Sequence, residues 1–175
     1  MPKTRTPSQV VSDTIARGGA RLLGNRRLMR APIWLYRRRL GFLFGSRMLM
    51  LEHIGRRSGV RRHVVLEVFG HPTADTYVVV SGFGSRSQWF RNVRATPDVR
   101  VFVGSRAPAQ ATARMLTSAE ADAALDEYVR RHPRAWARFK PVLEATLGAP
   151  IVDRDTRLPM IALRVDADRT APDDA

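Results

Sequence analysis

The chain contains no cysteine, so disulfide bonds, thiolate nucleophiles and thiolate metal sites are all excluded. It also lacks an uninterrupted apolar run of the roughly 20 residues that a membrane-spanning helix needs. The first twenty residues, MPKTRTPSQVVSDTIARGGA, have no apolar core of the kind found in secretory signal peptides. We therefore expect a cytoplasmic protein. With 175 residues, of which 44% are hydrophobic, the chain is long enough for one domain with a full core.

Acidic residues are scarce in the first third of the chain. Residues 1–62 hold 15 Lys and Arg against only Asp13 and Glu52, which leaves a net charge of +13. Residues 63–175 hold 15 basic residues against 14 acidic ones, a net charge of only +1. The positive charge of the first third can therefore act as one field on a polyanion or an anionic surface.

Apolar periodicity and turn residues predict a mainly β protein with helical insertions. No helix separates the strands expected between residues 48 and 82, which favours an antiparallel barrel or sheet over parallel βαβ units. Thr117 and Glu120 form a capping box for one helix. We expect helices within residues 10–47 and at 88–95, 118–132 and 134–147, and strands at 48–54, 63–70, 76–81, 99–104, 108–116 and 158–166.

The stretch HIGRRSGVRRH, residues 53–63, concentrates arginine in a turn between two apolar segments. It holds four arginines, a serine and two glycines. Guanidinium groups bind carboxylates and phosphates in a bidentate way, and glycine lets backbone N–H groups approach an anion closely. The turn is therefore either a solvated hairpin tip or a cradle for an anionic group, and both interpretations stay open.

Three sequence blocks resemble the deazaflavin-dependent nitroreductase family of actinobacteria. They are GRRSGVRR, VVVSGFGSRSQWFRNVRATPDVRV and LPMIALRV, and the resemblance covers about residues 40–166. It implies a six-stranded antiparallel split β-barrel that binds the 8-hydroxy-5-deazaflavin coenzyme F420. Hydride would pass from this coenzyme to a quinone, a nitro compound or an activated double bond. The phosphodiester and oligoglutamate tail of F420 suit the arginine-rich turn.

We expect residues 48–166 to form the coenzyme-binding barrel, residues 1–47 a basic helical extension of the same domain and residues 167–175 a loose tail. The resemblance assigns coenzyme contacts to the turn, the strand after it and the second block. Trp89 could equally pack against the barrel, and Ser81 with Gly82 could be ordinary turn residues. The expected coenzyme-binding residues are Arg56, Arg57, Ser58, Arg62, His63, Val64, Ser81, Gly82, Trp89, Phe90, Arg91 and Asn92.

Glu67 departs from the family, whose better-known members carry a tyrosine at the aligned position. A buried carboxyl group titrates upward and could donate a proton, so Glu67 and Ser81 are the candidate catalytic residues. Glu67 could instead be an outward residue on an alternating strand. Tyr128 and Trp136 could cover the substrate side or pack between helices.

Other functions stay open on the sequence. A related split barrel could bind FMN through the same turn, and a non-catalytic basic module could bind a membrane or, less expectedly, nucleic acid. The histidines lack carboxylate or cysteine partners at ligand spacing, so we expect no metal site. We expect a small-molecule substrate and a monomer or homodimer.

Residues 17–47 interleave arginines with large apolar residues, among them Trp34 and Tyr36. Such a segment is typical of an interfacial helix, in which apolar side chains enter the acyl boundary while arginines meet anionic head groups. It could dock the enzyme on the inner face of the cell membrane. Alternatively, its apolar face closes the barrel and leaves the arginines in water.

Overall fold

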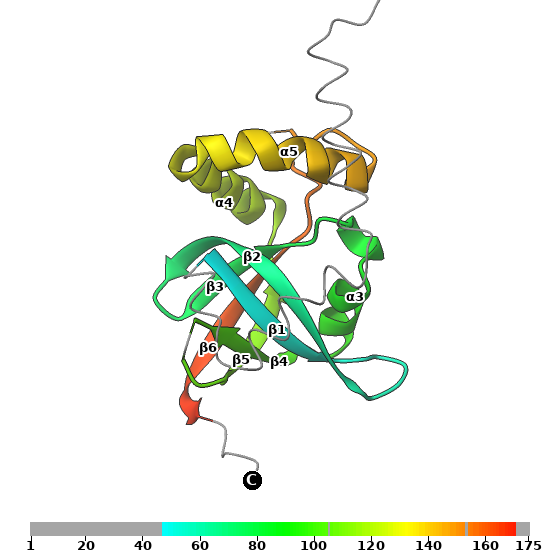
Figure 1. Ribbon diagram of the computed structural model, residues 1–175, viewed down its shortest axis with the longest axis vertical. Helices are drawn as coiled ribbons and strands as arrows, with labels where there is room; N and C mark the ends of the chain where they lie inside the picture. Colours follow the sequence, from blue (N-terminus) through cyan, green and yellow to red (C-terminus); the bar gives the residue numbers. More distant parts are fainter. Residues whose placement is uncertain (1–46, 105, 153, 171–175) are drawn as a thin grey trace, which may run out of the picture.

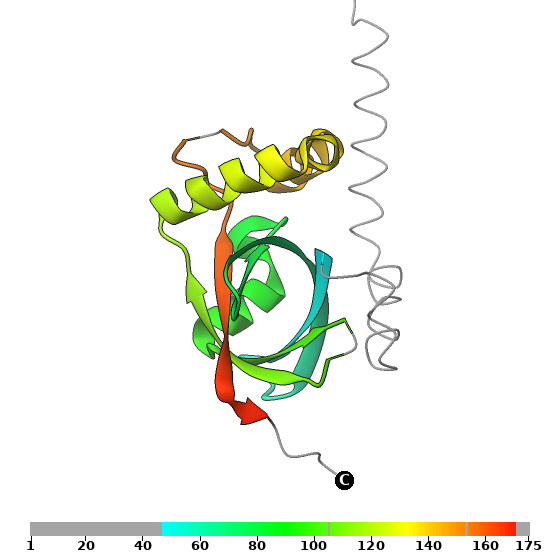
Figure 2. The same cartoon turned by 90° about the vertical axis from the view of Figure 1, so that its left-hand side faces the viewer.

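Six strands dominate the described chain, and hairpins join most of them in sequence order. The structure is a computed structural model that describes residues 47–104, 106–152 and 154–170. The strands close into a barrel in the order β1-β2-β3-β6-β5-β4, and each neighbouring pair is antiparallel (Figures 1 and 2). The predicted antiparallel barrel is confirmed. The strands are β1 (Met48–Ile54), β2 (Arg61–Thr73), β3 (Thr76–Val80), β4 (Asp98–Val103), β5 (Ala109–Met115) and β6 (Met160–Thr170).

Alternate residues of each strand fill the barrel interior, because successive side chains of a strand point to opposite faces. On β3, Tyr77 and Val79 belong to the interior cluster. Their neighbours Val78 and Val80 face outward and pack with Phe69 under the helices that follow β5. Both faces of β3 are therefore buried, which explains why its sequence is almost continuously apolar.

Two helices lie across one end of the barrel, and a third lies along its side (Figure 1). The capping box of Thr117 and Glu120 is present as predicted. Gly148 ends the helix Pro133–Leu147 with φ of 75°, a left-handed conformation that favours glycine. The roof helices are α4 (Ser118–Arg131) and α5 (Pro133–Leu147), and the side helix is α3 (Gln88–Ala95), preceded by the 3-10 turn η3 (Gly84–Arg86).

Two strands extend beyond their predicted ends. β2 covers residues 61–73 rather than 63–70, because backbone pairing continues from Ile54↔Arg61 at one end to Thr73↔Thr76 at the other. β6 continues to Thr170, which pairs with Ala109, so residues 167–170 belong to a strand rather than to a loose tail. The ladder uses backbone groups only, so polar side chains do not stop it.

The helices predicted within residues 10–46 and the residues after 170 lie outside the described part of the chain. Within the described part, no helix is long and apolar enough to cross a membrane.

Candidate functional site

The arginine-rich turn joins β1 to β2 as a hairpin that projects from the barrel beside α3 (Figure 1). Gly55 N donates to Val60 O at 2.9 Å, and Gly59 N donates to Gly55 O at 2.8 Å. Gly59 has φ of 64°, and a Cβ atom on Gly55 would lie only 2.7 Å from Ser58 Oγ. The left-handed backbone therefore favours glycine at position 59, whereas a side chain at position 55 would displace the Ser58 hydroxyl.

Arg56 ties this turn to the N-terminal part of α3. Its backbone N and its Nη1 both donate to Asn92 Oδ1, at 3.2 and 2.9 Å, and Nη1 also reaches Gln88 Oε1 at 3.0 Å. Asn92 is buried, so these bonds are shielded from water on one side. The structure thus brings together two predicted site residues, Arg56 and Asn92, but they bind each other instead of facing a ligand.

His53 completes the same network inside the barrel. Asn92 Nδ2 lies 3.3 Å from His53 Nδ1, and since Asn92 Oδ1 already accepts two bonds, its amide nitrogen is the donor. Burial lowers the pKa of His53 to about 4, so the imidazole is neutral near pH 7. Neither His53 nor Gln88 was expected at this site from the sequence, because no local motif marks either residue for such a role.

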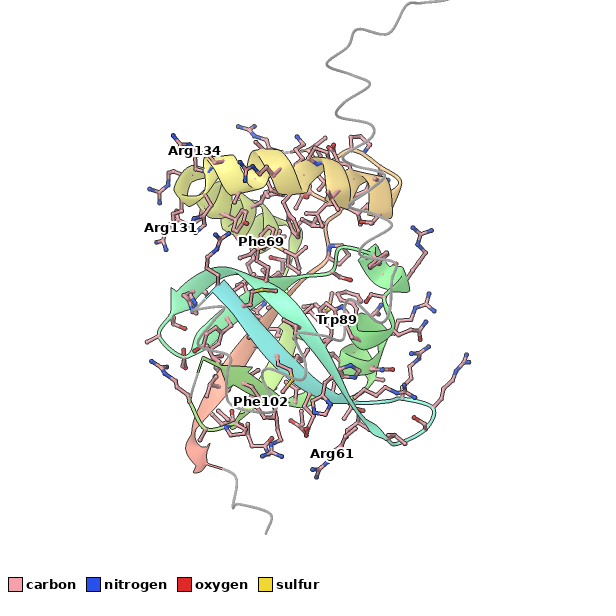
Figure 3. The ribbon with its side chains drawn as sticks, in the orientation of Figure 1. Arg61, Phe69, Trp89, Phe102, Arg131 and Arg134 are labelled. Carbon is pink, nitrogen blue, oxygen red and sulfur yellow. The ribbon has the colours of Figure 1, made fainter. Side chains whose placement is uncertain are left out.

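The other arginines of the turn keep most of their donors unused. Arg57 is exposed and makes no hydrogen bond or ion pair with any residue that the structure describes. Arg62 Nη2 makes one long bond of 3.4 Å to Ser58 Oγ, and Arg61 Nε lies 3.9 Å from Glu52 Oε1. Figure 3 shows Arg61 near the base of the hairpin, pointing away from the barrel. Their free guanidinium donors can meet a large anion from several directions.

Glu52 holds the outer face of β1 to its two neighbouring strands. Its Oε2 accepts from His63 Nε2 at 2.9 Å, and its Oε1 lies 3.8 Å from Arg100 Nη1. The His63 ring also packs edge-on against Phe102. The predicted site residue His63 therefore faces outward with one ring nitrogen engaged, whereas Val64 packs against the interior cluster.

The loop after β3 contains Ser81 and Gly82 and is held from within the protein. Ser81 is fully buried, and its hydroxyl donates to Gly84 O at 2.7 Å. Gly82 O accepts from Thr146 Oγ1 on α5. The Ser81 hydroxyl thus stabilises the turn, which is the alternative that the sequence left open.

Helix α3 directs its predicted site residues in different directions. Phe90 is 1% exposed and belongs to the interior cluster, so its ring is a core side chain. Trp89 is half-buried against the same cluster, and Figure 3 shows it between α3 and the barrel. Arg91 Nε donates to Ser85 O at 2.9 Å on the helix's outer side. Of these residues, Trp89 and Arg91 are the ones within reach of solvent.

Glu67 connects the barrel to the roof helices. Its Oε1 accepts from Tyr128 Oη at 2.6 Å and from Arg47 Nη2 at 3.1 Å. Burial and this hydrogen bond raise the pKa of Tyr128, which keeps its hydroxyl protonated as a donor. Phe69 lies between the barrel and the roof helices (Figure 3). Its ring stacks on Tyr128 and meets Trp136 edge-on, so both residues pack between helices and barrel.

Among the described residues, no group of three or more His, Asp or Glu side chains could hold a metal ion. The chemistry of the site is thus that of arginine and backbone donors around one turn, braced by an asparagine.

Comparison with known families gives one match that covers most of the chain. The model of the F420H(2)-dependent quinone reductase family matches residues 28–151. No curated protein matches the chain.

Several solved structures are similar to this chain at low sequence identity. A protein of unknown function from Agrobacterium tumefaciens is 18% identical, with a TM-score of 0.51, over 79% of this chain and 56% of that one. An F420-H2 dependent reductase, FDR-A, is 21% identical, with a TM-score of 0.48, over 67% of this chain and 94% of its own. A putative pyridoxamine 5'-phosphate oxidase from Listeria innocua is 13% identical, with a TM-score of 0.48, over 75% and 94% of the two chains.

Proposed function

This chain belongs to the F420H(2)-dependent quinone reductase family, and we propose that the β1–β2 turn and the start of α3 bind its coenzyme. As a member of this family, the protein is an oxidoreductase that uses coenzyme F420 to reduce a small acceptor. One observation supports the proposed site above the others. The Arg56 guanidinium binds Asn92 and so holds the turn against α3. Beside it, Arg57, Arg61 and Arg62 have guanidinium N–H groups that remain free to bind an anion.

The residues of the turn fit the anionic part of the coenzyme. A phosphodiester followed by carboxylates needs several charge-assisted donors, and an arginine supplies five N–H groups in a fixed fork. Gly59 is exposed and has open space beside it, so the backbone at the tip of the turn is accessible. We assign the anionic tail to Arg57 and Arg62, with Ser58 and Arg61 beside them. His63, Gly82, Trp89 and Arg91 remain further proposed contacts.

When bound, F420 supplies the hydride. The chain itself binds the coenzyme, neutralises its tail and holds it in a fixed position, which is the positioning part of catalysis. Asn92 contributes indirectly, because it locks Arg56 and therefore the path of the turn. The description of the matched family supports a quinone as acceptor, and we propose nitro compounds and activated double bonds as further acceptors.

Titration of the purified protein with F420 and with FMN tests the proposed site. Arg57→Ala and Arg62→Ala should each weaken F420 binding about tenfold, since a charge-assisted bond contributes roughly 1.5–3 kcal/mol. The loss should be larger at low than at high salt. Arg106→Ala, in the β4–β5 hairpin, is the matched control and should bind like the unmodified chain. Equal affinity in all four proteins, or tighter binding of FMN, would contradict the assignment.

We also propose that the protein acts in the cytoplasm at the inner face of the membrane, where quinones partition. The charge of +13 over residues 1–62 supports this, and so does Val60, a 57% exposed apolar residue of the arginine turn. Co-sedimentation with anionic and neutral vesicles tests it. A chain with Arg37, Arg38 and Arg39 replaced by Gln should lose most binding to anionic vesicles at low salt. Undiminished binding of that variant, or none by the unmodified chain, would overturn the proposal.

A further inference from the structure

A hollow lies beside the loop that follows β3. It is a cleft of about 280 Å³ between that loop, the end of α5 and the segment that leads into β6. Its lining is largely apolar, with Phe83, Leu147 and Ile151 among the side chains. Two arginines, Arg86 and Arg157, also line it, and none of the described residues that line it is acidic.

Both guanidinium groups have donors to spare. Arg86 Nη2 donates to Thr146 O at 3.1 Å, which leaves its remaining N–H groups free and fixes the side chain at the C-terminal end of α5. Arg157 is exposed and makes no hydrogen bond or ion pair within the described part of the chain. Glu144 on α5 is already engaged, because its Oε1 accepts from Ile151 N at 2.8 Å and lies 3.9 Å from Lys140 Nζ.

The wall of the cleft is preformed. A Cβ atom on Gly82 would lie 3.0 Å from Leu143 Cδ2, and one on Gly84 would lie 3.2 Å from Leu147 Cδ2, so the loop is pressed against α5. The hydrogen bonds of Ser81 to Gly84 O and of Thr146 to Gly82 O hold it there. Between the two glycines, Phe83 stands at the rim of the cleft with 39% of its surface exposed. Because the loop is already held in place, ligand binding would cost little additional conformational entropy.

We propose that this cleft binds a small amphipathic carboxylate, with its apolar body against Phe83, Leu147 and Ile151 and its carboxylate between Arg86 and Arg157. The apolar lining favours a ring or short chain, and the two unneutralised guanidinium groups select an anion over a neutral molecule. A volume of about 280 Å³ is just below that of sites for drug-sized ligands, so the ligand has about a dozen non-hydrogen atoms. This site is separate from the coenzyme turn, and its chemistry does not depend on F420.

Binding of 2-naphthoate and of its neutral analogue 2-naphthamide to the full chain, without coenzyme, tests the proposal. Titrations followed by amide NMR shifts should show saturable binding of the carboxylate, with the largest shifts at residues 82–87 and 147–151. The amide should bind about tenfold more weakly, because it cannot form charge-assisted bonds. Arg157→Gln should reduce the affinity for 2-naphthoate about tenfold, and Arg86→Gln should do the same.

Arg154→Gln is the matched control, since Arg154 is an exposed arginine of the same segment that does not line the cleft. It should bind 2-naphthoate like the unmodified chain. Absence of saturable binding would overturn the proposal, and so would Arg157→Gln and Arg86→Gln proteins that bind 2-naphthoate as tightly as the unmodified chain. A competition experiment with F420 tells whether the cleft binds the carboxylates of the coenzyme or those of a separate small molecule. Displacement of 2-naphthoate by F420 would assign the cleft to the coenzyme and also overturn the proposal, whereas simultaneous binding supports it.

Discussion

Asn92 Oδ1 accepts two hydrogen bonds from Arg56, one from the backbone N at 3.2 Å and one from Nη1 at 2.9 Å. The two residues are 36 positions apart, on α3 and on the β1–β2 turn. Because Asn92 is 3% exposed, it is a fixed point to which the exposed turn is attached. The precision of the turn therefore depends on a buried side chain that does not itself face solvent.

Asn92→Ala should weaken F420 binding about tenfold while the folded barrel persists. The substitution removes both bonds to Arg56 and leaves His53 Nδ1 without its donor, which should cost roughly 1–3 kcal/mol of unfolding free energy. Gln88→Ala removes only an exposed bond of 3.0 Å and is the control for stability, with little change expected in the free energy of unfolding. Calorimetric titration and thermal unfolding measure the two effects. An Asn92→Ala protein that binds F420 normally would show that the turn needs no anchor.

Glu67→Gln should retain the turnover number and lose stability. Glu67 accepts from Tyr128 and Arg47, which is the role of a carboxylate and not of a proton donor. We expect about 1 kcal/mol of destabilisation, and a similar loss in Tyr128→Phe, which removes the hydroxyl alone. Steady-state kinetics and denaturant unfolding provide the measurements. A large fall of kcat in Glu67→Gln together with a normal kcat in Tyr128→Phe would restore Glu67 as a catalytic residue.

The free energy of unfolding should fall as the pH drops from about 6.5 to 4. The folded protein keeps His53 neutral with a pKa of about 4, whereas the unfolded chain binds its proton near pH 6.5. The unfolded state therefore holds more protons over this range, and stability rises with pH. The contribution of His53, which is 4% exposed, is roughly 3 kcal/mol over the whole range.

His53→Gln should flatten this part of the pH profile, and a variant of the exposed His132, His132→Gln, should leave it unchanged. Denaturant unfolding at several pH values gives the three profiles. Parallel profiles for the unmodified chain and His53→Gln would contradict a lowered pKa of His53 in the folded protein.

Gly84→Ala should destabilise the loop beside α5. Gly84 has φ of 59°, and the new Cβ atom would lie 3.2 Å from Leu147 Cδ2. A left-handed alanine alone costs about 1–2 kcal/mol, which corresponds to a fall of about 2–8 °C in melting temperature. Gly70→Ala is the control, because Gly70 has open space for a Cβ atom and no positive φ. A melting temperature unchanged by Gly84→Ala would mean that the loop can move away from α5.

The local features of this protein were determined by neighbouring residues in the sequence. The apolar run TYVVV, the capping box of Thr117 with Glu120 and the turn GRRSG act over a few positions, so they predicted a strand, a helix start and the hairpin. The antiparallel barrel follows from such hairpins. Backbone pairing beyond the apolar residues was not predicted, because the ladder of β2 and β6 does not depend on side-chain type.

Only the tertiary structure decided which polar groups meet. Arg56 bonds to Asn92, Glu67 to Tyr128 and Arg86 to Thr146, across separations of 36, 61 and 60 positions. An arginine or a glutamate has the same composition and propensity whether it braces the fold or faces a ligand. The difference arises when the barrel closes and brings α3 to the β1–β2 turn and α5 to the loop after β3. Some arginine N–H groups then form hydrogen bonds within the protein, and others remain free to bind a ligand.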